Sequence, residues 1–163
     1  MSVEQRLEDL GIKLEPIHWP ESWNILRWQA SGNLIYLSGH GPREGQQVVY
    51  GERIGSVVSH RGKLGTDLDI DAGYDAAQIC ALNLLASLKV AIGDLNRVSQ
   101  IIKMLGMVNC VPDFGHQPEV INGASDLLVA ILGETGRHGR SAVGMASLPR
   151  CIPVEIEMIV EIS

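Results

Sequence analysis

The segment GETGRHGRSAVGMASLP, residues 133–149, combines four glycines with the basic side chains of Arg137, His138 and Arg140. Residues of these types can form two kinds of site. One is a loop whose backbone amides bind a phosphate, and the other is an arginine held in place to bind a carboxylate through paired hydrogen bonds. The secondary structure on either side of the glycines decides between them.

A phosphate-binding loop joins a strand to the N-terminus of a helix, whose amides point at the anion. The apolar periodicity predicts the reverse order here, with a helix over residues 116–133 followed by a strand from Arg140. The glycine turn therefore meets the negative end of the helix dipole. The glycine spacings of nucleotide-binding motifs are also missing. Arg140 can instead bind a carboxylate, stay solvated, or pair with Glu155 or Glu157 on a neighbouring strand.

The strongest helix signal covers residues 69–95, which begin with an aspartate cap and contain no proline before Gly93 ends the pattern. The polar positions of this segment fall at roughly helical spacing and leave a wide apolar face. They are Asp71, Asp75, Gln78 and Asn83. The second helix, 116–133, carries Pro118 near its start and Gly133 as its C-cap. A short leading helix is predicted at about residues 2–11, with Ser2 and Gln5 as a capping box and Gly11 at its end.

Strands are predicted around and between these helices from alternation and turn residues. Their ranges are 32–42, 98–111, 140–147 and 152–162, with weaker candidates at 46–51 and 56–65 around a Gly51/Gly55 turn. Residues 19–28 read as a proline-broken connector. The last strand alternates, with Glu155, Glu157 and Glu161 opposite its apolar face. The order predicts one α+β domain over residues 1–163, in which both long helices cover one face of a mixed sheet that ends in a hairpin.

Composition limits the function classes. A net charge of −6 argues against a nucleic-acid surface. The three cysteines and five histidines have neither disulfide nor metal-ligand spacing. The N-terminal residues lack the apolar centre of a signal peptide, and no run approaches the roughly 20 apolar residues of a membrane span, so we expect a cytoplasmic protein. A mean hydropathy of +0.11 indicates that some apolar surface lies in a subunit interface.

The C-terminal block RSAVGMASLPRCIPVEIEMIVEI resembles the signature of the RidA/YjgF family, also called L-PSP proteins. That signature is an Arg-Ser pair, a small-residue strand, Leu-Pro and then Val-Glu-Ile-Glu. GNLIYLSGHGP resembles the family's first conserved strand, which ends in Ser-Gly-Gln and a proline, and VINGASDLL resembles its second helix. The resemblance runs from about residue 30 to 162, and the leading helix is typical of a longer branch of the family.

The resemblance implies a chorismate-mutase-like fold and a homotrimer with clefts between subunits. Family members of the deaminase type hydrolyse 2-imino or enamine acids to 2-keto acids and ammonia, without a metal or organic cofactor. Arg140 matches the arginine that binds the substrate carboxylate, and Ser141 completes the Arg-Ser pair. Ser38, Asn122 and Glu155 match the serine of Ser-Gly-Gln, the helix asparagine and the first glutamate of Val-Glu-Ile-Glu.

This chemistry needs few groups, because an imine carbon is already electrophilic. Glu155 would orient or deprotonate a water. His40 stands where the family has glutamine, and its imidazole could supply a proton near neutral pH. Two other positions depart from the family: Ala142 replaces a frequent cysteine, and Ile25 falls where the deaminases carry an aromatic residue, with Trp23 and Trp28 close by.

Two function classes follow. The first is an imine or enamine deaminase. The second is a non-catalytic trimer that binds a small carboxylate, or regulates a partner, and keeps Arg140 without the full set of water-activating groups. Some family members carry a ribonuclease label, which the acidic charge and the lack of a basic stripe disfavour here.

Overall fold

The computed structural model describes residues 1–43, 47–50, 53–57 and 61–163. Five strands form one sheet and two form a separate hairpin. The sheet strands are β1 (Trp28–Ser31), β2 (Leu34–His40), β5 (Val98–Asn109), β6 (Gly139–Met145) and β7 (Val154–Ile162), and the hairpin strands are β3 (Gln47–Tyr50) and β4 (Arg53–Val57). The helices are α1 (Val3–Asp9), α2 (Ile70–Ile92) and α3 (Gln117–Leu132), with short 3-10 turns η1 (Leu95–Arg97), η2 (Gly133–Gly136) and η3 (Pro149–Cys151).

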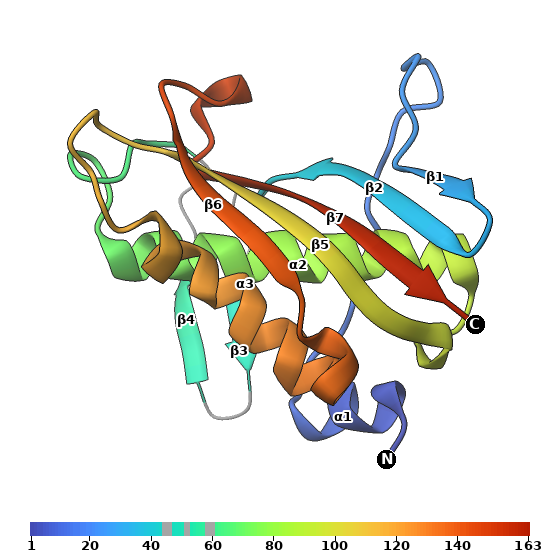
Figure 1. Cartoon of the computed structure of the whole chain (residues 1–163). Helices are drawn as coiled ribbons and strands as arrows, with labels where there is room; N and C mark the ends of the chain where they lie inside the picture. Colours follow the sequence, from blue (N-terminus) through green and yellow to red (C-terminus); the bar gives the residue numbers. More distant parts are fainter. Residues whose placement is uncertain (44–46, 51–52, 58–60) are drawn as a thin grey trace.

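The large sheet has the order β1-β2-β7-β5-β6, and only β5 and β6 run parallel, so the predicted mixed sheet is confirmed. The predicted terminal hairpin is wrong. The α3 crossover places β6 beside β5 at the edge, whereas β7 returns to the centre and pairs with both β2 and β5 (Figure 1). A central place suits β7, because its alternating pattern offers a continuous apolar face and a full ladder on each side. Arg140 therefore has no glutamate-bearing strand beside it.

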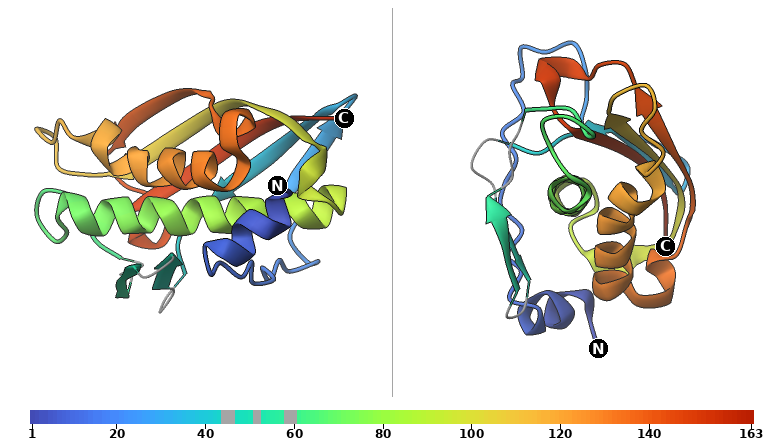
Figure 2. Two further views of the ribbon diagram at one scale, coloured as in Figure 1. Left: turned by 90° about the horizontal axis from the view of Figure 1, so that it is seen from below. Right: turned by 90° about the vertical axis from the view of Figure 1, so that its left-hand side faces the viewer.

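Both long helices cover one face of the sheet, as predicted (Figures 1 and 2). The helix ends follow the caps. Asp69 accepts a hydrogen bond from the Ala72 amide at 2.8 Å, and Gly93 and Gly133 end α2 and α3 with φ of 81° and 68°. The Ser2 capping box of α1 is also present, with Ser2 and Gln5 each accepting from the other's amide.

The polar positions of α2 do not face solvent as a stripe, which corrects the amphipathic prediction. Asp75, Gln78 and Asn83 are buried, because the β3–β4 hairpin lies against the side of α2 away from the sheet (Figure 2). Asn83 donates to the Gly41 carbonyl at 2.9 Å in this second layer of contacts. The helix is long and apolar enough to cross a membrane by composition, but 78% of its most apolar window is buried, as in the core helix of a folded domain.

Two local predictions need correction. The stretch 19–28 was expected to be a connector, yet its last residue begins β1, an edge strand that pairs with β2. The predicted strand at 56–65 begins earlier, as β4, so Gly55 lies inside a strand rather than in a turn. Residues 58–60 of that prediction, and Gly51, lie outside the described residues.

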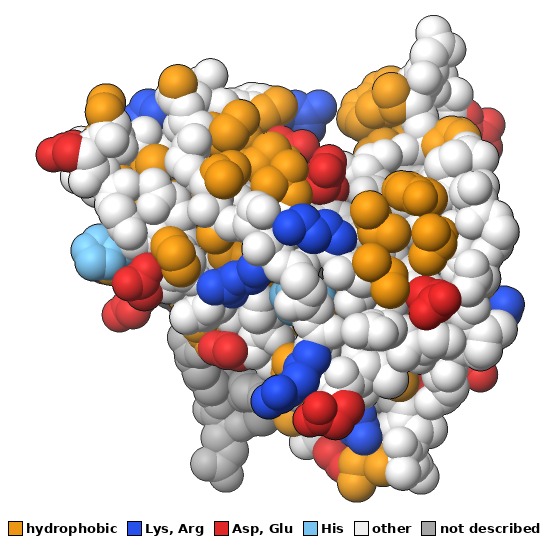
Figure 3. All heavy atoms as spheres, in the orientation of Figure 1, with side chains coloured by type: hydrophobic (Ala, Val, Ile, Leu, Met, Phe, Trp, Pro, Cys, Tyr) orange, Lys and Arg blue, Asp and Glu red, His pale blue; other side chains and the backbone are white. Residues whose placement is uncertain are grey.

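The sheet face opposite the helices is open and carries apolar side chains. Tyr36, Ile102 and Val143 are 42%, 40% and 38% exposed there, enough for a second chain to bury. On the face turned to the viewer in Figure 3, hydrophobic side chains gather in two groups with charged side chains between them. The glutamates of β7 alternate with buried apolar residues, as predicted.

Candidate functional site

Arg140 lies on the edge strand β6 and reaches across to α3. Its Nη1 donates to Ser125 Oγ at 2.9 Å, and its Nη2 donates to Asn122 Oδ1 at 2.7 Å and to the Pro118 carbonyl at 3.1 Å. All three acceptors are neutral. Within the described residues the half-buried guanidinium has no carboxylate partner, so no acidic side chain offsets its charge while these neutral groups orient it.

Ser125 and His138 extend this arrangement. Arginine can only donate, so Ser125 Oγ accepts from Arg140, and it donates to His138 Nε2, 3.0 Å away, when the imidazole is neutral with its proton on Nδ1. His138 Nδ1 then donates to the Gly136 carbonyl at 2.6 Å. This direction requires a neutral imidazole. Burial lowers the pKa of His138, the bond to Gly136 raises it in part, and the charge of Arg140 lowers it again.

Sequence reasoning missed Ser125 and His138, although both follow simple periods. Ser125 lies three residues after Asn122 and so shares its helix face. His138 lies two residues before Arg140 and so shares its side of the strand. The two predicted neighbours of Arg140 behave differently. Ser141 points to the open face, where it accepts from Lys103 Nζ at 3.0 Å, and Ala142 packs against the core.

Glu155 lies on β7, on the open side of the sheet, and is half-buried. It has no hydrogen-bond or ion-pair partner among the described residues. Burial raises the pKa of Glu155, and the charge of Glu157 raises it further. Gly39 lies directly against this carboxylate. A Cβ at position 39 would lie 2.9 Å from Glu155 Cδ and closer still to Oε1, so the glycine gives the carboxylate its space.

Ser38 and His40 flank that glycine where the β2–β7 register shifts. Ser38 Oγ donates to the Leu26 carbonyl at 2.6 Å. His40 turns toward α2 and is 4% exposed, with Nδ1 2.6 Å from the Ser38 carbonyl and Nε2 2.7 Å from Ser87 Oγ. Burial lowers the pKa of His40 more than its bond to Ser38 raises it. Both ring nitrogens are thus engaged in the single chain, away from the carboxylate.

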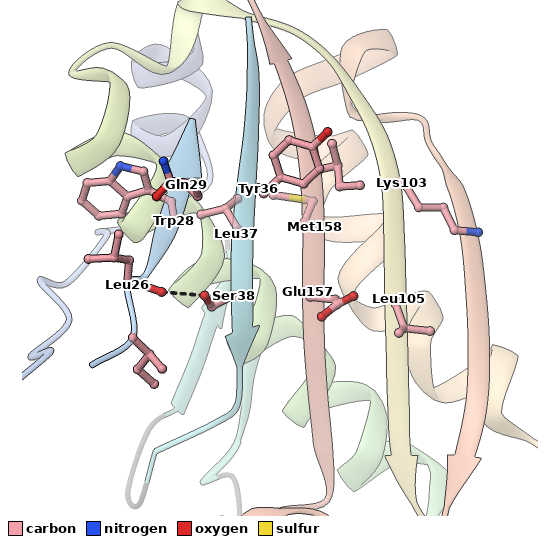
Figure 4. Close-up of a pocket in the computed structure, with 12 residues that line it drawn as sticks. Leu26, Trp28, Gln29, Tyr36, Leu37, Ser38, Lys103, Leu105, Glu157 and Met158 are labelled. Atoms are coloured by element: carbon pink, nitrogen blue, oxygen red, sulfur yellow. Dashed lines mark hydrogen bonds between the residues drawn. The ribbon is translucent and has the colours of Figure 1, made fainter. Parts of the chain in front are cut away.

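Glu155 and Glu157 line different hollows. Glu155 lines a cavity of about 340 Å³ together with Trp19, Trp23, His40 and Arg150. Glu157 lines a wider hollow of about 510 Å³ on the open face, shown in Figure 4 beside Tyr36, Leu105 and Lys103. Ile25, at the family's aromatic position, borders both.

One chain does not bring Arg140 and Glu155 together. Arg140 is opposite Met104 of β5, whereas Glu155 is opposite Met107, so the two lie three positions apart along the sheet. They also lie two strands apart and on opposite faces. Asn122 is the one predicted partner that reaches Arg140. In the part of the chain that the structure describes, no three histidine, cysteine or acidic side chains are grouped as metal ligands.

Residues 29–158 match the family model described as "YjgF/chorismate_mutase-like, putative endoribonuclease". Protein TCP17 of Trypanosoma cruzi is 37% identical over 162 residues, covering 99% of this chain and 94% of that protein. The crystal structure of Atu1372 from Agrobacterium tumefaciens, a protein of unknown function, has 43% identity and a TM-score of 0.84, over 99% of this chain and 94% of that one. A "putative endoribonuclease" of Shewanella oneidensis has 29% identity and a TM-score of 0.86, over 99% and 100% of the two chains.

Proposed function

This chain belongs to the YjgF/chorismate-mutase-like family, and on that premise we propose that it hydrolyses 2-imino or enamine acids to 2-keto acids and ammonia. The observation that carries the proposal is the guanidinium of Arg140. It is fixed by three neutral acceptors, and no acidic side chain among the described residues offsets its charge. A carboxylate can form paired, charge-assisted hydrogen bonds with it, each worth roughly 1.5–3 kcal/mol, by displacing Asn122 Oδ1 or the Pro118 carbonyl from Nη2.

Glu155 supplies the water-activating group. Its raised pKa brings it nearer to neutrality, where a carboxylate can both accept and return a proton. As the water oxygen bonds to the imine carbon, Glu155 takes a proton from the water, and the C=N electron pair moves to nitrogen, which receives that proton from Glu155. Glu155 then takes the hydroxyl proton of the carbinolamine and passes it to the amine nitrogen, so that the C–N bond breaks, ammonia leaves and the hydroxyl oxygen becomes the keto oxygen. Water is consumed, and no oxidant or cofactor is needed for this balance.

The two groups are supplied by different subunits in this proposal. Arg140 and Glu155 lie on opposite faces of one sheet, so a single molecule cannot use both on one substrate. A homotrimer with three equivalent sites would join them, and the exposed apolar residues of the open face support such an assembly. Dissociation of the trimer would therefore abolish activity, because it would separate Arg140 of one subunit from Glu155 of the next.

A second candidate is a trimer that binds a small carboxylate without catalysis. It is favoured by His40, whose ring nitrogens are both engaged, because the predicted extra proton donor then has no free nitrogen facing the cavity. Ala142 in place of the family's cysteine points the same way. Ribonuclease activity is disfavoured by the net charge of −6.

The deciding experiment offers freshly generated 2-iminopropanoate and 2-iminobutanoate to the purified protein and follows loss of the imine. Acceleration over buffer is expected, and Glu155→Gln should lower it by about 10²-fold, the usual scale for losing acid–base help. Glu157→Gln is the matched control, since Glu157 lines a different hollow. Arg140→Lys should weaken pyruvate binding, because an ammonium cannot reproduce the guanidinium fork.

The two candidates separate cleanly. Wild-type protein that binds pyruvate through Arg140 but does not accelerate hydrolysis is the non-catalytic trimer. Pyruvate binding that survives both Arg140→Lys and Arg140→Ala would show that Arg140 does not bind the carboxylate.

A further inference from the structure

All three tryptophans of the chain lie within residues 19–28, and two of them line the cavity beside Glu155. We infer that this cavity receives the side chain of the substrate and selects for an aromatic ring, so that the preferred substrates are aromatic 2-imino acids. The inference rests on the proposed function for the reaction itself. Both tryptophans precede residue 29, where the match to the family model begins, so the model itself does not include them.

One wall of the cavity is a fixed aromatic pair. Trp19 and Trp23 pack edge to face, with centroids 5.5 Å apart at 68°. Trp19 Nε1 donates to the Ile25 carbonyl at 3.1 Å, and its ring stacks on His40 at 5.8 Å and 29°. These contacts orient Trp19 before any ligand arrives. Trp23 is 41% exposed, so its ring keeps surface that a ligand can cover.

The opposite wall comes from the segment that leads into β7. Pro149, Arg150 and Ile152 border the cavity there. Arg150 and Cys151 both have left-handed backbones, with φ of 56° and 58°, which directs this turn back toward the N-terminal segment. The Arg150 guanidinium lies 6.0 Å from the Trp23 ring centre and has no hydrogen-bond or ion-pair partner among the described residues. It therefore adds a flat cation to this wall of the cavity, near the Trp23 ring.

Size and charge match an aromatic acid. The volume of about 340 Å³ is at the small end of the range for small-molecule sites. Arg150 brings a cation to the cavity that Glu155 lines, and this guanidinium can attract the carboxylate of a ligand. Gly41 also lines the cavity and packs closely on Ile152, because a Cβ at Gly41 would lie 2.5 Å from Ile152 Cδ1. An aromatic acid fits these features, because its ring can lie between the walls and its carboxylate can lie near the cation.

The test compares phenylpyruvate with pyruvate as probes, by calorimetry on the intact protein. Phenylpyruvate should bind about tenfold more tightly or better, the scale of stacking added to apolar burial. Trp23→Ala and Trp19→Leu should each remove most of that preference, because they should weaken phenylpyruvate binding much more than pyruvate binding. Trp28→Leu is the matched control, because Trp28 lies on β1 and does not line this cavity, so the preference should survive it.

Equal affinities for the two acids, failure of phenylpyruvate to bind, or a preference that persists in both tryptophan variants would overturn the inference. Arg140→Ala separates this result from the proposed function. If Arg140→Ala abolishes the binding of both acids and the wild-type protein shows no preference for phenylpyruvate, only the aromatic selectivity of the cavity is refuted. If phenylpyruvate binding depends on the tryptophans but is unchanged in Arg140→Ala, the aromatic selectivity of the cavity is supported and the placement of Arg140 in the same site is refuted.

Discussion

Replacing Gly39 with alanine moves the proposed base without removing it. The new Cβ would lie 2.9 Å from Glu155 Cδ and 3.1 Å from Cγ, with Oε1 closer still, so the carboxylate must turn away. The displacement is on the order of 1 Å, and a misplacement of that size can cost about 10²-fold in rate. The atoms that must move belong to the end of a flexible side chain, which keeps the cost to folding small.

Stability and activity should therefore separate in Gly39→Ala. Gly39 does not have a left-handed backbone, and alanine in a strand recovers about 0.5–1 kcal/mol of backbone entropy, so the free energy of unfolding should stay within about 1 kcal/mol of wild type. Imine hydrolysis should fall by about 10²-fold at unchanged oligomeric state. Urea unfolding, light scattering and the imine assay measure the three quantities.

Gly115→Ala is the control for this comparison, because no atom lies within 4 Å of a Cβ at that position. It should leave both stability and rate unchanged. Full activity in a folded Gly39→Ala protein would refute the reasoning, since the carboxylate beside Gly39 could not then be a positioned catalytic group.

Three further predictions concern folding. Gly123→Ala should lower the free energy of unfolding by about 1–3 kcal/mol in urea titrations, because its Cβ would lie 2.9 Å from the Tyr74 carbonyl carbon, in backbone that cannot turn aside; an unchanged value would contradict the close helix crossing. The lowered pKa of His40 contributes stability that is present above about pH 6.5 and is lost as the pH falls, since the unfolded chain then binds the proton more readily. His40→Gln should flatten the pH dependence of unfolding between pH 7.5 and 5.5, and an unaltered slope would exclude His40 as a source. Ser2→Ala should cost α1 about 1 kcal/mol and speed amide exchange at Gln5, where equal exchange rates would show that the cap does not matter.

The regular elements were predictable because their signals are local. Asp69 and Gly93 mark the ends of α2, and the alternation around Glu155 and Glu157 identifies β7 and its two faces. The order of the strands in the sheet has no local signal in the sequence. Nothing in the sequence of β6 shows that α3 carries it to the far edge, and so the predicted hairpin with β7 failed.

The candidate site shows the same division. The contact between Arg140 and Asn122 agrees with the resemblance that singled out both residues, and Ser125 and His138 could have been found from helix and strand periods. The burial of the polar side of α2 could not be predicted from the sequence, because it depends on a hairpin that packs on α2 from outside the sheet and helix layers. The relation of Glu155 to the tryptophans also required the fold, since more than a hundred residues of chain separate Trp23 from Glu155.

Subunit mixing tests the central claim most directly, since that claim is that Arg140 of one chain and Glu155 of another form one site. On this account the Arg140→Ala and Glu155→Gln proteins are each inactive. In the experiment the two proteins are mixed in equal amounts, unfolded with denaturant and refolded together. Each position is intact in half of the subunits, so about a quarter of the sites between subunits should regain both groups and restore about a quarter of wild-type imine hydrolysis. Activity no higher than that of the separate variants, from mixed oligomers that have formed, would contradict a shared site.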